Sequence, residues 1–279
     1  MSTKTNNSTH PLMGTEHHKR FEKTIRGLCR RNELWKVFSD FCEMSAIALS
    51  QPFMKDAKRE ERYLALINSY DENERMLFPQ LLSETVLALS ETECDFLGEL
   101  FMGLELGSHW HGQYFTPFNI CKFMGAITIT DIEEGLKTKE FYTVMEPCVG
   151  SGAMVIGLAS ALKEKGINYQ RAIHVTGVDI SSTAVHMAYI QLALIHIPAR
   201  LYIGNSLSNK WDSVFVTPAH CMGLWDYKLK REKEAVAEVS PPDANPPVAQ
   251  EAPIDLFGKV PPEIPAPPAK TPIQPSLFA

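Results

Sequence analysis

Residues 141–166 read FYTVMEPCVGSGAMVIGLASALKEKG, and this stretch decides the fold class. It predicts a buried strand over 141–147, a glycine turn, and a helix that ends at Gly166. A strand, a glycine turn and a helix in this order form the first unit of a doubly wound parallel sheet. Gly150 and Gly152 let a ligand approach backbone that a Cβ would block, and the helix N-terminus offers N–H groups. We therefore expect a ligand site where this strand ends.

The glycine turn has two rival interpretations, and the sequence fits neither. A phosphate-binding loop needs Gly-Lys-Ser or Gly-Lys-Thr at its end, which is missing here. The fingerprint of a dinucleotide-binding fold needs a third glycine at a fixed spacing, which is also missing.

Two further strands follow the turn, and each ends in a polar residue. AIHVTGVDIS (172–181) predicts a strand that ends in Asp179, whose two oxygens can accept hydrogen bonds from the hydroxyls of a ribose. The same side chain is also suited to cap the helix that follows. RLYIG (200–204) predicts a third strand that leads into Asn205, which either pairs with the edge of an adenine ring or forms an ordinary turn.

Composition changes along the 279 residues and suggests five regions. Apolar residues at helical spacing predict a helical N-terminal region, and strands alternate with helices after it. Twelve of the 19 prolines lie in the last 40 residues, a composition that cannot form a packed core. The expected regions are a disordered N-terminus (1–15), a helical region (16–110), an α/β domain (111–226), a charged helix (227–239) and a disordered proline-rich tail (240–279).

Charge, cysteine content and hydropathy exclude several classes of protein. No apolar run approaches the roughly 20 residues of a membrane span, and the polar N-terminus has no apolar signal core, so we expect a cytoplasmic protein. The six cysteines include no CxxC pair, which favours reduced thiols and no metal site. The net charge of −6 argues against a surface built wholly for nucleic acid. The basic stretch 17–31 fits the solvated face of an amphipathic helix, with a phosphate-contacting surface as the alternative.

Four segments in a fixed order resemble a known family. They are HGQYFTP (111–117), EPCVGSG (146–152), GVDIS (177–181) and IGNSL (203–207). Together they resemble the N6-adenine DNA methyltransferases, and most closely the modification subunits of type I restriction systems. The resemblance covers about residues 90–225 and includes DFLGELFMGLELG (95–107), which is similar to the helix that enters the domain.

The resemblance implies an α/β fold: the doubly wound parallel sheet of AdoMet-dependent methyltransferases (Rossmann-like), here truncated, after a helical N-terminal region. It also implies S-adenosylmethionine (AdoMet) as the cofactor. Asp179 would bind the ribose, and Asn205 would lie near the adenine, where the family more often has aspartate. The other implied cofactor-binding residues are Gln113, Tyr114, Phe115, Thr116, Pro117, Glu146, Pro147, Gly150 and Gly152.

WDSVFVTPAH (211–220) resembles the fourth strand and the catalytic motif of that family, which reads Asn or Asp, Pro, Pro, aromatic. Thr217, Pro218, Ala219 and His220 stand at these four positions. In the family's chemistry, a side-chain amide and a backbone carbonyl accept hydrogen bonds from the adenine amine, and the aromatic residue stacks on the flipped base. Losing such an acceptor typically costs roughly a hundredfold to a thousandfold in rate. We therefore expect weak or absent catalysis, or catalysis completed by a partner or specificity subunit.

Little sequence remains after this motif to complete the family fold. About three more strands and a module that opens DNA would be needed, whereas one charged helix and the tail follow His220. NPPV (245–248) repeats part of the motif, but it lies in low-complexity sequence without a preceding strand, so we interpret it as a coincidence.

Two short segments of the tail end in Leu-Phe: PIDLF (253–257) and QPSLF (274–278). They resemble the pentapeptide by which bacterial proteins dock into the replication sliding clamp, and this implies partner-binding roles for Leu256, Phe257, Gln274, Leu277 and Phe278. Two weak anchors on one linker can bind a multivalent ring by raising effective concentration. The alternatives are that the segments fold back on their own domain or have no role.

Two classes of function remain open from the sequence. The first is an AdoMet-dependent adenine-specific DNA methyltransferase that uses the altered motif at 217–220. The second is a non-catalytic AdoMet-binding protein that binds nucleic acid or protein and interferes with restriction or attends replication.

Overall fold

A computed structural model describes residues 15–29, 31–106, 114–208 and 210–239. The described residues up to 233 belong to one compact unit, and residues 234–279 form a second, of which only the end of the last helix is described. Of the helices in these ranges, none has both the length and the apolar composition needed to cross a bilayer.

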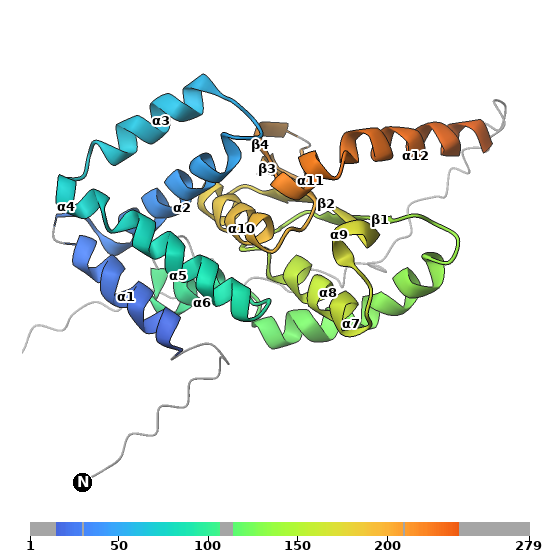
Figure 1. Ribbon diagram of the computed structural model, residues 1–279, viewed down its shortest axis with the longest axis horizontal. Helices are drawn as coiled ribbons and strands as arrows, with labels where there is room; N and C mark the ends of the chain where they lie inside the picture. The colour runs from blue at the N-terminus through green and yellow to red at the C-terminus, as the bar shows by residue number, and fades with distance from the viewer. Residues whose placement is uncertain (1–14, 30, 107–113, 209, 240–279) are drawn as a thin grey trace, which may run out of the picture. The chain divides into compact units, whose positions relative to one another are not determined.

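Within the described residues up to 106, six helices precede the α/β part (Figure 1). Their starts are locally encoded, because Thr15, Asp56, Asp71 and Asp95 each accept a hydrogen bond from a backbone N–H in the first turn of the helix that follows. The helices are α1 (Glu16–Leu28), α2 (Leu34–Ser50), α3 (Ala57–Ile67), α4 (Glu72–Arg75), α5 (Phe78–Glu91) and α6 (Phe96–Gly103).

The second part of the chain alternates helices and strands around a four-stranded sheet. The strands are β1 (Tyr142–Glu146), β2 (Ile173–Asp179), β3 (Ala199–Asn205) and β4 (Lys210–Val216). The helices are α7 (Phe118–Gly135), α8 (Ala153–Glu164), α9 (Tyr169–Ala172), α10 (Ser182–Leu194), α11 (Pro218–Met222) and α12 (Trp225–Val239).

The sheet has the order β1-β2-β3-β4, and its first three strands are parallel. Helix α8 connects β1 to β2, and α10 connects β2 to β3. Because such crossovers are right-handed and both step in the same direction, α8 and α10 cover the same face of the sheet. The carboxyl ends of β1, β2 and β3 therefore meet at one edge of the sheet, as the sequence predicts.

Strand β4 corrects one sequence expectation, since it runs antiparallel to β3. A short connection after Asn205 turns the chain back, and β4 pairs along the outer side of β3 with a bulge between Ile203 and Gly204. Consequently β1 has no neighbouring strand on its other side among the described residues. The carboxyl end of β4 then lies at the edge where the parallel strands begin.

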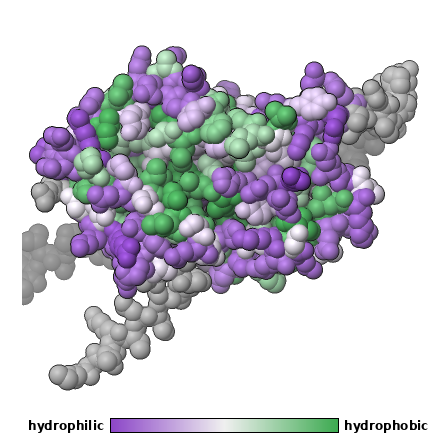
Figure 2. All heavy atoms as spheres, in the orientation of Figure 1, coloured by the Kyte–Doolittle hydropathy of each residue, from purple (hydrophilic) through white to green (hydrophobic). Residues whose placement is uncertain are grey.

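One hydrophobic core joins the helical part to the sheet. Phe21 and Phe41 of the first helices belong to the same buried cluster as Val175 and Leu201 of the sheet. Helix α2 packs against α10, and the Arg59 guanidinium lies 3.9 Å from the centre of the Phe215 ring on β4. On the face drawn in Figure 1, apolar side chains gather near the middle, with polar side chains around them (Figure 2).

Candidate cofactor site

The glycine turn after β1 depends on backbone conformations that favour glycine. Gly150 has φ of 54° and Gly152 has φ of 93°, both in the left-handed region. The turn is fixed to β2 because Val149 N–H donates to Val178 O at 2.8 Å, and it is closed by Gly152 N–H donating to Val149 O at 2.8 Å. A Cβ at Gly150 would lie 3.1 Å from the Phe115 ring, so glycine also makes room for that ring.

Asp179 lies directly against this turn. Its Oδ2 accepts a hydrogen bond from Gly150 N–H, and its Oδ1 accepts one from Ser181 N–H, each at 2.9 Å. The side chain that caps α10 is Ser181, whose hydroxyl accepts from Ala184 N–H, so the capping role considered for Asp179 is taken by its neighbour. The structure thus brings the turn and the carboxylate together at the carboxyl edge of the sheet.

Glu146 is a second carboxylate at this edge. It is the last residue of β1, is half-buried, and accepts a hydrogen bond from Cys148 N–H at 3.2 Å. Burial raises the pKa of Glu146, and the negative charge of Asp179 raises it further, although the Cys148 hydrogen bond opposes both effects. Among the described residues, neither Glu146 nor Asp179 forms an ion pair with a basic side chain. Within the described ranges, the two carboxylates therefore lie side by side without a basic side chain paired to either.

The segment before α7 approaches the turn through one aromatic ring. Phe115 is half-buried and packs against Phe101 of α6 with 5.1 Å between ring centroids. Tyr114, Thr116 and Pro117 are exposed beside it. Gln113 lies outside the described residues, so its cofactor role stays a prediction.

Pro147 and Asn205 lie on the same edge as the carboxylates, and both are exposed. The Asn205 Oδ1 accepts hydrogen bonds from Leu207 N–H at 2.9 Å and Ser208 N–H at 3.3 Å. This is the local geometry of a turn asparagine, which was one of the two alternatives from the sequence. An adenine contact by Asn205 stays a prediction.

A buried polar network supports the turn, and the sequence did not identify it. Asp95, at the start of α6, accepts a hydrogen bond from the Ser151 hydroxyl at 2.6 Å. Gln191 of α10 donates to Asp95 Oδ1 and to Ser151 O, both at 2.8 Å. The three side chains come from segments far apart in the chain, and all three are buried. The one sign of this network in the sequence is Gln191, a glutamine within the mainly apolar run 182–197.

Ile180 is a further residue at this edge of the sheet, and the sequence analysis did not single it out. It follows Asp179 directly, and 77% of its side chain is exposed, although it is large and apolar. An exposed apolar side chain beside two carboxylates suits the flat face of a base, since ligand sites combine apolar surface with a few polar groups. Its position after the acidic residue was the only sequence signal.

The expected catalytic residues lie elsewhere, and this corrects the sequence interpretation. Thr217 is fully buried; its hydroxyl accepts from Ala199 N–H and donates to Ile197 O, each at 2.8 Å. Since Ala199 begins β3, Thr217 lies at the amino edge of the parallel strands, opposite the glycine turn. The physical reason is the antiparallel direction of β4, which strand periodicity alone does not specify. Pro218 starts α11 at this same edge.

His220 is also buried at this edge. It shares a hydrogen bond of 2.8 Å with His174 of β2, and its Nε2 lies 2.9 Å from Asp226 Oδ1. Burial, and then the neighbouring His220, lowers the pKa of His174 to about 3, so His174 is uncharged near neutral pH. Burial also lowers the pKa of His220, although the hydrogen bond to Asp226 opposes this effect. A ring held between these partners cannot stack on a base in solution.

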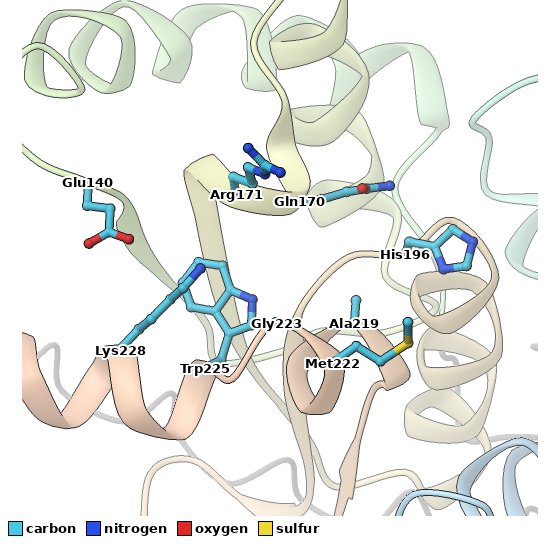
Figure 3. A pocket seen from close by; sticks show the side chains of 9 residues that line it. All are labelled: Glu140, Gln170, Arg171, His196, Ala219, Met222, Gly223, Trp225 and Lys228. Atoms are coloured by element: carbon cyan, nitrogen blue, oxygen red, sulfur yellow. The ribbon is translucent and has the colours of Figure 1, made fainter.

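A hollow of about 910 Å³ opens near these residues (Figure 3). Ala219 and Met222 of α11 line it, together with Arg171 of α9 and Lys228 of α12. Neither Thr217 nor His220 belongs to its lining. Of the altered motif, only Ala219 therefore lines the hollow, and the two polar side chains do not.

The five predicted partner-binding residues of the tail (Leu256, Phe257, Gln274, Leu277 and Phe278) lie outside the described residues. Docking on a sliding clamp therefore stays a prediction.

With this geometry established, comparisons with known proteins identify the family. The profile of a family described as N-6 DNA Methylase matches residues 105–245, half of the chain. The chain belongs to the N-6 DNA methylase family. Membership confirms the resemblance inferred from the four motifs, and the matched range includes the glycine turn, Asp179 and the altered motif. Among curated protein sequences, none matches the chain significantly.

Two solved structures are similar to the chain. One is a Listeria monocytogenes protein assigned to the class I S-adenosylmethionine-dependent methyltransferases, with 16% identity over 71% of this chain and 56% of that one, and a TM-score of 0.38. The other is the methyltransferase subunit of a type I restriction-modification system from Streptococcus thermophilus, with 12% identity over 71% of this chain and 60% of that one, and a TM-score of 0.37. The chain thus matches 56–60% of the length of these proteins. Similarities this low add no argument to the family assignment.

Proposed function

We propose that this N-6 DNA methylase family member binds S-adenosylmethionine at the carboxyl edge of β1 and β2 and takes part in adenine-specific DNA modification. One observation carries the proposal: the hydrogen bond of 2.9 Å from Gly150 N–H to Asp179 Oδ2. It holds the acidic residue next to the turn, and this supports the proposal, because a carboxylate beside such a turn can accept hydrogen bonds from ribose hydroxyls.

The charge of the site favours this cofactor over phosphate-bearing ones. S-adenosylmethionine carries a positively charged sulfonium and a positively charged ammonium group. The carboxylates of Glu146 and Asp179 would attract both groups. The same two carboxylates would repel the pyrophosphate of a dinucleotide or the phosphates of a nucleotide. Ile180 would provide apolar surface for the adenine ring. When bound, the cofactor would supply an activated methyl group, while these residues hold and orient it.

A panel of ligands measured by thermal unfolding tests this proposal. S-adenosylmethionine is expected to raise the unfolding temperature, because a ligand that binds only the folded state stabilises it by mass action. S-adenosylhomocysteine, which lacks the sulfonium charge, is expected to give a smaller rise, and NAD and ATP none. Stabilisation by NAD or ATP and not by S-adenosylmethionine would contradict the proposal.

The place of the altered motif favours a second candidate, a cofactor-binding protein without methyl transfer activity of its own. Thr217 and His220 are buried at the opposite edge, so neither can accept a hydrogen bond from an adenine at the cofactor site. A transfer assay with labelled S-adenosylmethionine and adenine-containing DNA separates the two candidates. No transfer by a chain that binds the cofactor supports the second; transfer that Thr217→Val, which removes the hydroxyl, leaves unchanged would support an active enzyme with other catalytic groups.

A partner subunit could supply the catalytic groups that this chain does not place at the proposed cofactor site, and this would explain how a member of a methylase family could still take part in methyl transfer. We propose that, if transfer occurs, the groups that contact the adenine come from such a partner chain. The assay is therefore run with the chain alone and with the methyltransferase and specificity subunits of a type I system. Transfer only in the mixed sample supports a completing partner, and equal transfer in both samples contradicts it.

A further inference from the structure

Ser151 links the glycine turn to the interior of the protein. Only 1% of this residue is exposed, although it lies inside the turn of the candidate cofactor site. Its hydroxyl donates to Asp95 Oδ2 at 2.6 Å, and its carbonyl oxygen accepts from Gln191 Nε2 at 2.8 Å. Both the side chain and the backbone of Ser151 are therefore held in one orientation. This orientation helps to fix the neighbouring Gly150 N–H, which donates to Asp179.

Each polar atom of the Gln191 side chain has a partner. The Nε2 donates to Asp95 Oδ1 and to Ser151 O, each at 2.8 Å, and the Oε1 accepts from Leu97 N–H at 3.0 Å. Gln191 is fully buried, so water does not replace a hydrogen bond that is lost here. A buried network whose members are all satisfied specifies a single arrangement. Gln191 thus holds α10, α6 and the turn together in one arrangement.

Helix α6 also contacts the turn closely. A Cβ at Gly98 would lie 2.5 Å from the Ser151 hydroxyl, so a larger residue on α6 would displace that hydroxyl. Further along α6, Phe101 packs against Phe115, whose ring in turn lies beside Gly150. Helix α6 therefore contacts the turn through a polar link and through an apolar link.

We propose that Asp95 and Gln191 are positioning residues of the cofactor site. They are buried and act through Ser151, which keeps the Gly150 N–H in place and with it Asp179. The inference rests on the proposed function, because it concerns the same turn and the same carboxylate. It adds that α6 and α10 contribute to cofactor affinity, and that this contribution is separate from their contribution to the stability of the fold.

Coupling between a ligand site and a supporting network is reciprocal. A cofactor that stabilises the turn must therefore also stabilise the network. The N–H groups of Leu97 and Gly98 donate to the side chains of Gln191 and Asp95, so they report on the network from within α6. Hydrogen exchange of these two amides is expected to slow when S-adenosylmethionine is bound.

Two matched variants separate positioning from stability. Ser151→Ala removes a hydroxyl that donates at 2.6 Å to the buried Asp95, and Tyr70→Phe removes one that donates at 2.6 Å to the buried Asp40 of the helical region. Both variants are expected to unfold at a lower temperature, because each leaves a buried carboxylate with one hydrogen bond fewer. Only Ser151→Ala is expected to weaken S-adenosylmethionine binding, by about tenfold in a calorimetric titration.

Substitutions of Asp95 test whether the network acts as one unit. Asp95→Ala is expected to weaken binding as much as Ser151→Ala does, and the double variant is expected to be no weaker than either single one, because residues of one network are not additive. Asp95→Asn is expected to bind nearly as well as the wild type. Its amide oxygen can accept from Gly98 N–H and Gln191, and its amide nitrogen can donate to the Ser151 hydroxyl.

Hydrogen exchange without cofactor distinguishes a failure of this inference from a failure of the proposed function. Relative to the wild type, the Gly150 amide is expected to exchange about tenfold faster in Ser151→Ala and at an unchanged rate in Tyr70→Phe. Faster exchange in a chain whose wild type binds no S-adenosylmethionine would support the positioning of the turn and contradict the proposed cofactor. Unchanged exchange in Ser151→Ala, or unchanged cofactor affinity in that variant, would overturn the inference.

Discussion

At the scale of single residues, the candidate site is defined by two carboxylates whose surroundings differ. Asp179 has both oxygens engaged by backbone N–H groups, so it is held in one position. Glu146 has one such partner, and burial and its acidic neighbour raise its pKa. Asp179 is therefore suited to orient a ligand. Glu146 is suited to attract a cationic group, because a bound positive charge would stabilise its ionised form.

Glu146→Gln separates these two contributions. Glutamine keeps an oxygen for Cys148 N–H and removes the charge. We expect the affinity for S-adenosylmethionine to fall about tenfold, because a charge-assisted contact is replaced by a neutral one. The unfolding temperature is expected to stay the same or rise slightly, because a half-buried charge beside Asp179 disappears. Calorimetric titration and thermal unfolding measure the two quantities.

Asp212→Asn on β4 provides the control, since this exposed carboxylate lies on the opposite edge strand. Its affinity is expected to equal that of the wild type. If Glu146→Gln binds as tightly as the wild type, the acidic site is not the cofactor site.

At the scale of helices and strands, the packing of α7 on α8 requires a close approach. A Cβ at Gly157 would lie 2.6 Å from the carbonyl carbon of Cys121, which is closer than packed atoms tolerate. Backbone cannot yield as a flexible side chain does. The two helices therefore depend on glycine at their crossing.

Gly157→Ala is expected to lower the free energy of unfolding by about 1–3 kcal/mol, the typical cost of overpacking. Gly27→Ala in α1 is the matched control, because a Cβ there has no atom within 4 Å. That substitution is expected to raise stability by about 0.5–1 kcal/mol through helix propensity. Urea unfolding of both variants measures the two changes in the free energy of unfolding. If Gly157→Ala and Gly27→Ala change it equally, the close crossing of α7 and α8 has no energetic role.

The local units of the fold could be predicted from the sequence, whereas the strand direction could not. The turn at Gly150 and Gly152, the helix after it and the carboxylate at Asp179 follow from residue type and spacing, which act over a few residues. The reversal of β4 depends on the turn after Asn205 and on what packs against Phe215, and an apolar strand pattern has no direction. The placement of Thr217 and His220 was therefore wrong.

The supporting network could not be predicted either. Asp95, Ser151 and Gln191 interact only after three distant segments have packed together. Each residue also has an ordinary local interpretation: Asp95 as a helix cap, Ser151 as a turn residue. Long-range polar contacts of this kind have no local sequence pattern.

At the scale of the whole molecule, two buried groups give the stability opposite dependences on pH. Burial lowers the pKa of His186 to about 4, and burial and Asp95 raise the pKa of Glu99 to about 7. In the unfolded chain His186 takes up a proton near pH 6.5. The contribution of His186 to the stability of the fold is therefore present above that pH and is lost as the pH falls towards 4. Glu99 holds its proton more tightly in the folded protein than in the unfolded chain. The contribution of Glu99 to the stability of the fold is therefore present below about pH 4.5 and is lost as the pH rises through 7.

Substitutions at the two positions are expected to change the pH profile in opposite directions. Each group contributes on the order of 1.4 kcal/mol per pH unit within its window. His186→Leu is expected to reduce the loss of stability between pH 6.5 and 5, and Glu99→Gln to reduce the loss between pH 5 and 7. Urea unfolding across this range measures both slopes. Profiles parallel to that of the wild type would contradict the assigned pKa directions.

The most direct test of the central claim is calorimetric titration of S-adenosylmethionine into the wild-type chain and into Asp179→Ala, with the folded state of both confirmed by circular dichroism. We predict one bound cofactor per wild-type chain and an affinity at least about tenfold lower in the variant, because the carboxylate beside the glycine turn is lost. A folded wild-type chain that releases no heat, or a variant that binds with unchanged affinity, would contradict the assignment of this edge of the sheet as the cofactor site.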